Sequence, residues 1–120
     1  MNLPNDLPVT VLRTLVQSLP SLSVLVFDHD LRYLMAEGQS LVRHGHDPAA
    51  MIGRSLFEVL PENRAVALAE SYRSALAGQT VRHEHNVDGF VYASSFMPVY
   101  DANCQIVAGM VVVEDITKRH

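Results

Sequence analysis

Apolar residues recur at helical spacing near the start of the chain, over residues 10–19. Arg13, Gln17 and Ser18 occupy the opposite side of this segment, and Pro20 ends it. The residues that share the apolar face are Leu12, Leu15, Val16 and Leu19. This pattern predicts a short amphipathic helix.

Two short apolar runs follow, at residues 23–27 and 31–36. Between them stand Asp28, His29 and Asp30, and small acidic residues favour a tight turn. We therefore expect the two runs to form a β-hairpin.

Residues 37–62 change to the signals of short helices. Asp47 before Pro48 is typical of a helix start, because the carboxylate caps the first turn and proline suits its first position. Ser55 and Glu58 have the spacing of a capping box. We expect at least two short helices here.

The longest helix is predicted to follow Asn63 and to end at Gly78, a residue type that commonly terminates helices. The residues on its apolar face are Leu68, Ala69, Tyr72, Ala75 and Leu76. Because this face is continuous, we expect the helix to cross one face of a sheet.

Three more strands are predicted near the end of the chain, at residues 80–86, 90–99 and 106–114. Polar turns at 87–89 and 101–103 separate them. Two strands, several helices and three strands in this order predict an α+β fold. We expect a single five-stranded antiparallel sheet with the short helices and the longer one on one face.

The strand at residues 90–99 carries apolar side chains on both faces. Tyr92 and Phe96 lie on one side, whereas a sheet with its second face in water would have polar residues on the other. The residues on that second side include Val91, Ala93, Met97 and Val99. We expect the helix at residues 10–19, alone or with its copy from a second subunit, to cover this face. The sequence therefore predicts a homodimer.

Composition limits the function classes. A chain of 120 residues with 48% hydrophobic content forms about one domain. A net charge of -4, with nine scattered Lys and Arg residues, argues against a nucleic-acid partner. The longest apolar run, 106–113, is too short to insert into a membrane, and residues 1–12 lack the basic start of a signal peptide, so we expect a cytoplasmic protein. The single Cys104 excludes an internal disulfide.

Several motifs together resemble a PAS domain over residues 23–117. They are the acid-rich first turn in VFDHDLRYLMAEG (26–38), the glycine of MIGRSLFEVLP (51–61), the proline of SFMPVYD (95–101) and the hairpin IVAGMVVVEDIT (106–117). Each motif is common by itself, and their order and spacing make the match specific.

The resemblance implies a domain plan and an output route. Residues 1–22 would form a flanking helix, 23–117 the PAS domain, and 118–120 the start of a linker, so we interpret the chain as a module excised from a longer protein. In this family an Asp-Ile-Thr sequence closes the last strand and leads toward an effector such as a histidine kinase or a diguanylate cyclase. Asp115 and Thr117 would stand at this exit. The alternative is that they merely form a polar strand end.

PAS domains bind ligands between the sheet and the helices, so each cofactor can be compared with the residue that it needs. A covalent flavin requires a cysteine in an Asn-Cys-Arg motif, where this chain has Gly53, Arg54 and Ser55. A haem ligated from the long helix requires a histidine, which residues 63–77 lack. Both cofactors are therefore disfavoured, and the cofactor stays unknown.

Histidines instead form two His-x-His pairs, His44 with His46 and His83 with His85. The second pair lies on the same strand face as Val81. If that face is the core face, both imidazoles point toward the pocket, where they could bind a metal, ligate a haem or hydrogen-bond an acidic ligand. The alternative is that both rings reach water. We assign no metal site, because zinc would need a third ligand, such as Asp88 or His44.

The candidate ligand pocket is largely hydrophobic, and its residues pack equally well as an ordinary core. The candidate residues are Met35, Phe57, Leu60, Tyr72, His83, His85, Tyr92, Ser94 and Phe96. The sequence leaves these two interpretations open.

Three functions remain. The first is a PAS sensory domain that binds a small molecule or dimerises, and passes its state to a covalently linked effector. The second is a ligand-free PAS dimerisation module. The third, a small α+β enzyme, is disfavoured because no catalytic motif is recognisable and His83-Glu84-His85 lacks the further glutamate of a cupin-like site. We predict the first, with no enzymatic activity.

Overall fold

The computed structural model describes residues 7–43 and 45–118, which form five helices and five strands. The helices are α1 (Leu7–Ser18), α2 (Gln39–Arg43), α3 (Pro48–Met51), α4 (Leu56–Val59) and α5 (Glu62–Leu76). The strands are β1 (Leu22–Phe27), β2 (Tyr33–Gly38), β3 (Val81–Val87), β4 (Phe90–Tyr100) and β5 (Ile106–Asp115). The predicted element order is confirmed. Residues 1–6 and 119–120, at the outer ends of the predicted flanking segment and linker, lie outside the described residues.

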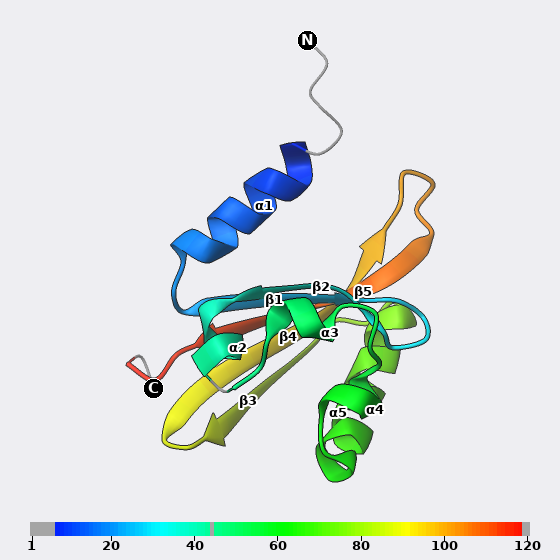
Figure 1. Cartoon of the computed structure of the whole chain (residues 1–120). Helices are drawn as coiled ribbons and strands as arrows, with labels where there is room; N and C mark the ends of the chain where they lie inside the picture. Colours follow the sequence, from blue (N-terminus) through cyan, green and yellow to red (C-terminus); the bar gives the residue numbers. More distant parts are fainter. Residues whose placement is uncertain (1–6, 44, 119–120) are drawn as a thin grey trace.

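The strands form one antiparallel sheet in the order β2-β1-β5-β4-β3 (Figure 1). The last strand therefore lies in the centre, between the first strand and β4. This single five-stranded sheet confirms the predicted α+β class.

The helix ends follow the sequence signals at the start of α3 and at the end of α5, whereas α5 begins at Glu62 and not after Asn63. Asp47 caps α3, with its Oδ1 accepting a hydrogen bond from the Ala49 amide at 3.1 Å. Gly78, at φ +98°, ends α5 as expected. The predicted capping box of Ser55 and Glu58 is wrong, since the Ser55 side chain makes no cap bond and the Glu58 carboxylate faces Arg32.

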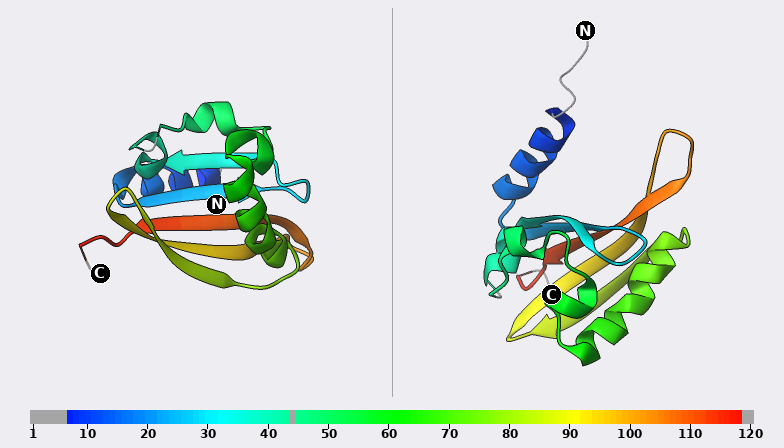
Figure 2. Two further views of the ribbon diagram at one scale, coloured as in Figure 1. Left: turned by 90° about the horizontal axis from the view of Figure 1, so that it is seen from below. Right: turned by 45° about the vertical axis from the view of Figure 1, so that its right-hand side comes forward.

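Helices α2 to α5 gather on one face of the sheet, whereas α1 lies on the opposite face, against β1 and β2 (Figures 1 and 2). Val16 is 1% exposed there, and Arg13 Nε pairs with Glu37 Oε1 of β2 at 2.9 Å. The N-terminal helix therefore lies on the expected second face of the sheet, but it packs against β1 and β2 and not against β4, the strand for which this cover was predicted.

The sheet face that carries α1 is only partly covered. On this face, Met97 of β4 and Met110 of β5 are half-buried. The predicted apolar face of α1 is also divided: Val16 points to the sheet and Leu12 is half-buried, but Leu15 and Leu19 are 53% and 42% exposed. A single chain therefore buries only part of this face, and the assignment of the four residues to a dimer interface stays a prediction.

The main core lies between the sheet and α5, and aromatic rings dominate it. Phe27, Tyr33, Tyr72 and Phe96 are all at most 2% exposed. Gly109 lies opposite Phe27 in the pairing of β1 with β5, and a Cβ at this position would overlap the Phe27 ring. The absence of a side chain at Gly109 therefore lets the outer edge of the Phe27 ring come close to the central strand.

Candidate functional site

Tyr72 of α5 is the centre of the helix–sheet interior. Its ring stacks on Phe27, with centroids 4.2 Å apart and planes at 17°, and lies 5.8 Å from the Phe96 ring. Its hydroxyl lies 2.8 Å from that of Tyr33 on β2. Burial raises the pKa of both phenols, well above the usual value for Tyr72. Both groups are therefore neutral hydrogen-bonding groups near pH 7 and are unsuited to act as bases.

The histidine pair of β3 borders this interior. His83 Nε2 lies 3.2 Å from Ser71 Oγ of α5, and the His83 ring lies 5.9 Å from that of Phe96. The His85 ring lies 5.9 Å from that of Tyr92. The two imidazoles thus lie on the α5 side of the sheet and are open to solvent, and a ligand role for them stays a prediction.

The environment of His85 disfavours a positive charge. Desolvation by its neighbours is the largest cause that lowers the pKa of His85, followed by the charges of Arg64 and His83. A neutral imidazole at this position can donate or accept a hydrogen bond.

Most of the predicted pocket residues come together in this region. Tyr72, Tyr92, Ser94 and Phe96 are buried, and Leu60 is half-buried against the same core. Ser94 pairs with His83 across β3 and β4, and Tyr92 pairs with His85. These residues form one continuous surface beside α5.

Met35 and Phe57 do not join this surface, and their assignment to the pocket is corrected. The pairing of β1 with β2 is irregular between Val26 and Phe27, so that Tyr33 and Ala36, rather than Met35, belong to the core. Phe57 is 45% exposed. Its neighbour Leu56 takes the inward position of the single-turn helix α4.

Sequence reasoning missed two residues of this interior, Phe27 and Tyr33. The sequence places Phe27 in a strand as the last large residue of an apolar run, and nothing in that pattern indicates its contact with Tyr72. The Tyr33 hydroxyl gave no signal, because its partner Tyr72 lies 39 residues further along the chain. Only the three-dimensional structure brings the two phenols together.

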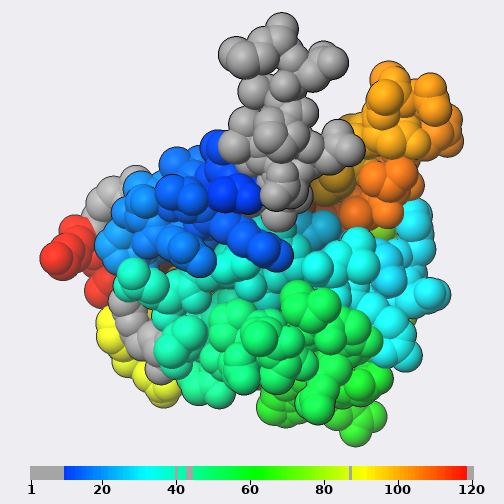
Figure 3. Space-filling model, turned by 45° about the horizontal axis from the view of Figure 1, so that its top comes forward, coloured from blue at the N-terminus to red at the C-terminus, as the bar shows by residue number. Residues whose placement is uncertain are grey.

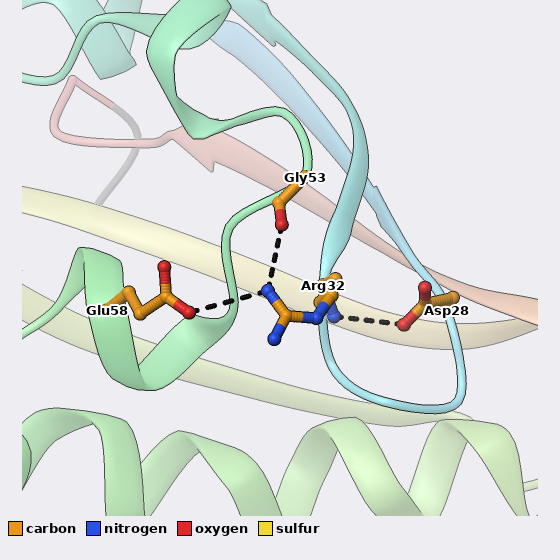
Figure 4. Close-up of polar contacts among 4 residues, drawn as sticks. All are labelled: Asp28, Arg32, Gly53 and Glu58. Carbon is orange, nitrogen blue, oxygen red and sulfur yellow. Dashed lines mark hydrogen bonds and ion pairs between the residues drawn. The ribbon is translucent and has the colours of Figure 1, made fainter.

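The acidic turn between β1 and β2 is a structural element (Figure 4). Asp28 Oδ1 accepts hydrogen bonds from the Asp30 amide at 2.9 Å and the Arg32 amide at 3.0 Å. Arg32 Nη1 donates to the Gly53 carbonyl at 2.9 Å and pairs with Glu58 Oε1 at 3.4 Å. These bonds connect the turn to Gly53, between α3 and α4, and to Glu58 of α4, so the acidic turn has a structural role.

The end of β5 is joined to two other parts of the chain. Thr117 Oγ1 donates to Asp115 Oδ1 at 2.6 Å and accepts a bond from the Val91 amide at 2.9 Å, and the Thr117 amide donates to the same Asp115 oxygen at 3.0 Å. The Asp115 amide donates to the Ser21 carbonyl at 2.8 Å. We call this group of bonds the β5 latch. It connects the last strand to the start of β4 and to the segment between α1 and β1.

Within residues 7–43 and 45–118 no three His, Cys, Asp or Glu side chains gather as a metal site would require. His44, named above as a possible third ligand, lies outside the described residues. In the same part of the chain, no helix is long and apolar enough to cross a membrane.

Comparison with known families agrees with this architecture. The family model described as PAS fold matches residues 17–120, and the chain therefore belongs to the PAS fold family. PAS domains are in general sensory modules without catalytic activity. A comparison with curated protein sequences gave no match.

Three solved structures illustrate the similarity. A domain of an HTR-like protein from Haloarcula marismortui is 25% identical, with a TM-score of 0.63 over 80% of this chain and 98% of that one. The PAS domain of BvgS from Bordetella pertussis is 19% identical, with a TM-score of 0.72 over 96% and 90%. A sensory box sensor histidine kinase from Vibrio cholerae is 15% identical, with a TM-score of 0.66 over 90% and 92%.

Proposed function

We propose that this PAS domain is a signal-transduction module whose state leaves through the β5 latch toward a covalently linked effector. The observation that carries the proposal is the latch itself. A single threonine hydroxyl bridges Asp115 and Val91, while the Asp115 amide holds the Ser21 carbonyl. A change in the position of β5 would therefore alter both the chain leaving the domain and the base of α1.

The input would be a small molecule bound beside α5, near His83, His85, Ser94 and Tyr92. Ser71 and His83 supply polar groups at the open side of an interior that is otherwise aromatic. An apolar site with a few convergent polar groups suits small-molecule binding. Binding would favour one arrangement of α5 against the sheet, and the signal would be a population shift.

A second function, a ligand-free dimerisation module, is favoured by two other observations. The stacked rings of Phe27 and Tyr72 fill the centre of the interior. In addition, Leu15 and Leu19 of α1 are exposed beside a half-buried sheet face that includes Met97 and Met110. The α1 helix of a second copy would cover these residues and complete the second layer.

The proposed effector is a histidine kinase or a diguanylate cyclase, and this proposal depends on the family of the chain and on its similarity in fold to known structures. Histidine kinases and diguanylate cyclases both receive signals from PAS domains, and a sensor histidine kinase is among the structures of similar fold. We expect residues 118–120 to begin the connecting linker.

The first experiment compares native with denaturing mass spectrometry on the freshly purified chain, with an absorbance scan of the same sample. A mass lost on denaturation identifies a retained ligand and supports the sensory function. Protein without a ligand at twice the monomer mass supports the dimerisation module. A monomer without ligand, even after screening of small-molecule libraries, would contradict both.

The output route is tested in a chimera in which this chain replaces the PAS domain of a sensor histidine kinase. Asp115→Ala removes the acceptor of the latch, and we expect it to uncouple kinase activity from the state of the domain. We expect the fold and any ligand affinity to stay intact, because Asp115 pairs with Tyr92 at the end of β5 but does not belong to the core cluster around Tyr72. A parallel loss of ligand binding would count against the proposed route.

A further inference from the structure

A groove runs along the outer edge of β2, beyond the point where Tyr33 forms a β-bridge with Ile52. Strand β2 is the terminal strand of the sheet, and α1 and α3 border its edge. Figure 3 shows the blue helix α1 beside the teal segment that contains the end of β2, α2 and α3. The groove has a volume of about 450 Å³, and its main lining residues are Arg13, Met35, Glu37, Asp47, Pro48 and Ile52.

A smaller hollow of about 230 Å³ extends this edge groove toward Gln17 and Val42. The two hollows are neighbours, because Glu37 and Pro48 line both of them. The larger volume lies within the range of small-molecule sites, roughly 300 to 1,000 Å³.

The edge groove has an apolar floor. Met35 is half-buried, and Ile52 is 47% exposed although it is a large aliphatic residue. Val42, at the far end, is 62% exposed. A ligand with a hydrophobic body would remove this apolar surface from water, which is favourable.

The charges of the described lining residues favour a cation. Glu37 and Asp47 supply two carboxylates, against the one guanidinium of Arg13. That guanidinium is already paired with Glu37, Nε to Oε1 at 2.9 Å, and lies on the outer side with 56% of its side chain exposed. Asp47 Oδ1 accepts the Ala49 amide at 3.1 Å, and its exposed carboxylate keeps further acceptor capacity toward solvent.

We propose that the edge groove binds a small amphipathic amine, with its apolar body on Met35 and Ile52 and its ammonium group near Asp47 and Glu37. The site is separate from the one beside α5 and does not depend on the proposed signalling function. Because α1, β2 and α3 all border the groove, the bound amine would also fix α1 against the sheet.

The test uses three probes that share one aromatic body and differ in charge: phenethylamine, 2-phenylethanol and phenylacetate. Amide chemical shifts of the full 120-residue chain are followed by NMR at pH 7. We expect the amine to shift the amides of Glu37, Ala49 and Ile52 in a saturable way. The alcohol should bind about threefold to fivefold more weakly, the size of an exposed charge pair, and the acid more weakly still.

A matched variant isolates the charge. Asp47→Asn keeps a side-chain oxygen for the helix cap, since asparagine caps as well as aspartate. It should weaken amine binding about threefold and leave the binding of the alcohol unchanged. Ile52→Ala should weaken both probes, because it removes part of the shared floor.

Two results would overturn the proposal. Equal affinity for the amine and the acid would exclude recognition of charge. Amine-induced shifts confined to His83, His85 and other residues beside α5, with Ile52 unmoved, would place the binding outside the edge groove.

Discussion

Replacing Thr117 with valine removes the hydroxyl that joins the end of β5 to the start of β4. The change keeps the shape of the side chain but deletes two hydrogen bonds, to Asp115 at 2.6 Å and from the Val91 amide at 2.9 Å. A neutral bond contributes about 0.5–1.5 kcal/mol and a bond to a charged group about 1.5–3 kcal/mol. Because both bonds are only partly buried, we expect the free energy of unfolding to fall by about 1–3 kcal/mol.

A double-mutant cycle separates the latch from general effects. Asp115→Ala removes the acceptor of the Thr117 hydroxyl and amide, so the two substitutions delete a shared interaction. The double variant should cost about 1 kcal/mol less than the sum of the single ones, measured by urea unfolding. Thr80→Val, at an exposed position before β3, is the control and should change little.

Amide hydrogen exchange at Val91 gives a local readout of the same cycle. Thr117→Val leaves this amide without its side-chain acceptor, and its exchange should become faster. Strict additivity of the two substitutions, together with unchanged exchange at Val91, would show that the latch contributes nothing and would refute this reasoning.

Further results are expected from changes at Val16, Leu15, Gly109 and His85. Val16→Ala should lower the free energy of unfolding by about 2 kcal/mol, whereas Leu15→Asp should leave the monomer folded and dissociate any dimer in light scattering. Gly109→Ala should lower the melting temperature, with a cost of about 1–3 kcal/mol from overlap with Phe27. Because the pKa of His85 is lowered in the folded chain, the unfolded chain binds its proton more tightly, and stability should fall as the pH drops below about 6.5. His85→Gln should flatten this dependence in unfolding measurements at pH 5 to 7, and an unchanged slope would contradict it.

The fold could be predicted because each element carries its own local signal. The turn predicted at Asp28 is stabilised by the Asp28 carboxylate itself, which accepts two backbone hydrogen bonds. In the same way, Asp47 caps the helix that it precedes. The spacing of apolar residues and the residue types of turns are properties of neighbouring positions, so they can be recognised in a single sequence. The antiparallel order then follows from short connections between the strands.

The pocket was harder to predict because it depends on which face each side chain takes. One irregular step in the pairing between Val26 and Phe27 places Ala36, and not Met35, in the core. The alternation rule cannot detect such a step. In the same way, Ser55 and Glu58 have capping-box spacing, but the Arg32 guanidinium competes for the glutamate and is distant in sequence.

The central place of β5 explains how an event beside α5 could reach both ends of the domain. Val111 of β5 packs in the same core as Tyr72 and pairs with Phe96 of β4. On its other side β5 pairs with β1, and its last amide holds the Ser21 carbonyl next to α1. A shift of α5 that moves Phe96 must therefore be absorbed by β5 or by β3, the edge strand on the far side of β4. Strand β3 is an edge strand and can move without disturbing a further neighbour. The β5 latch, in contrast, holds the end of β5 in one position. In the proposed signalling route, the strength of these bonds would set the free-energy difference between the latched and the released end of β5.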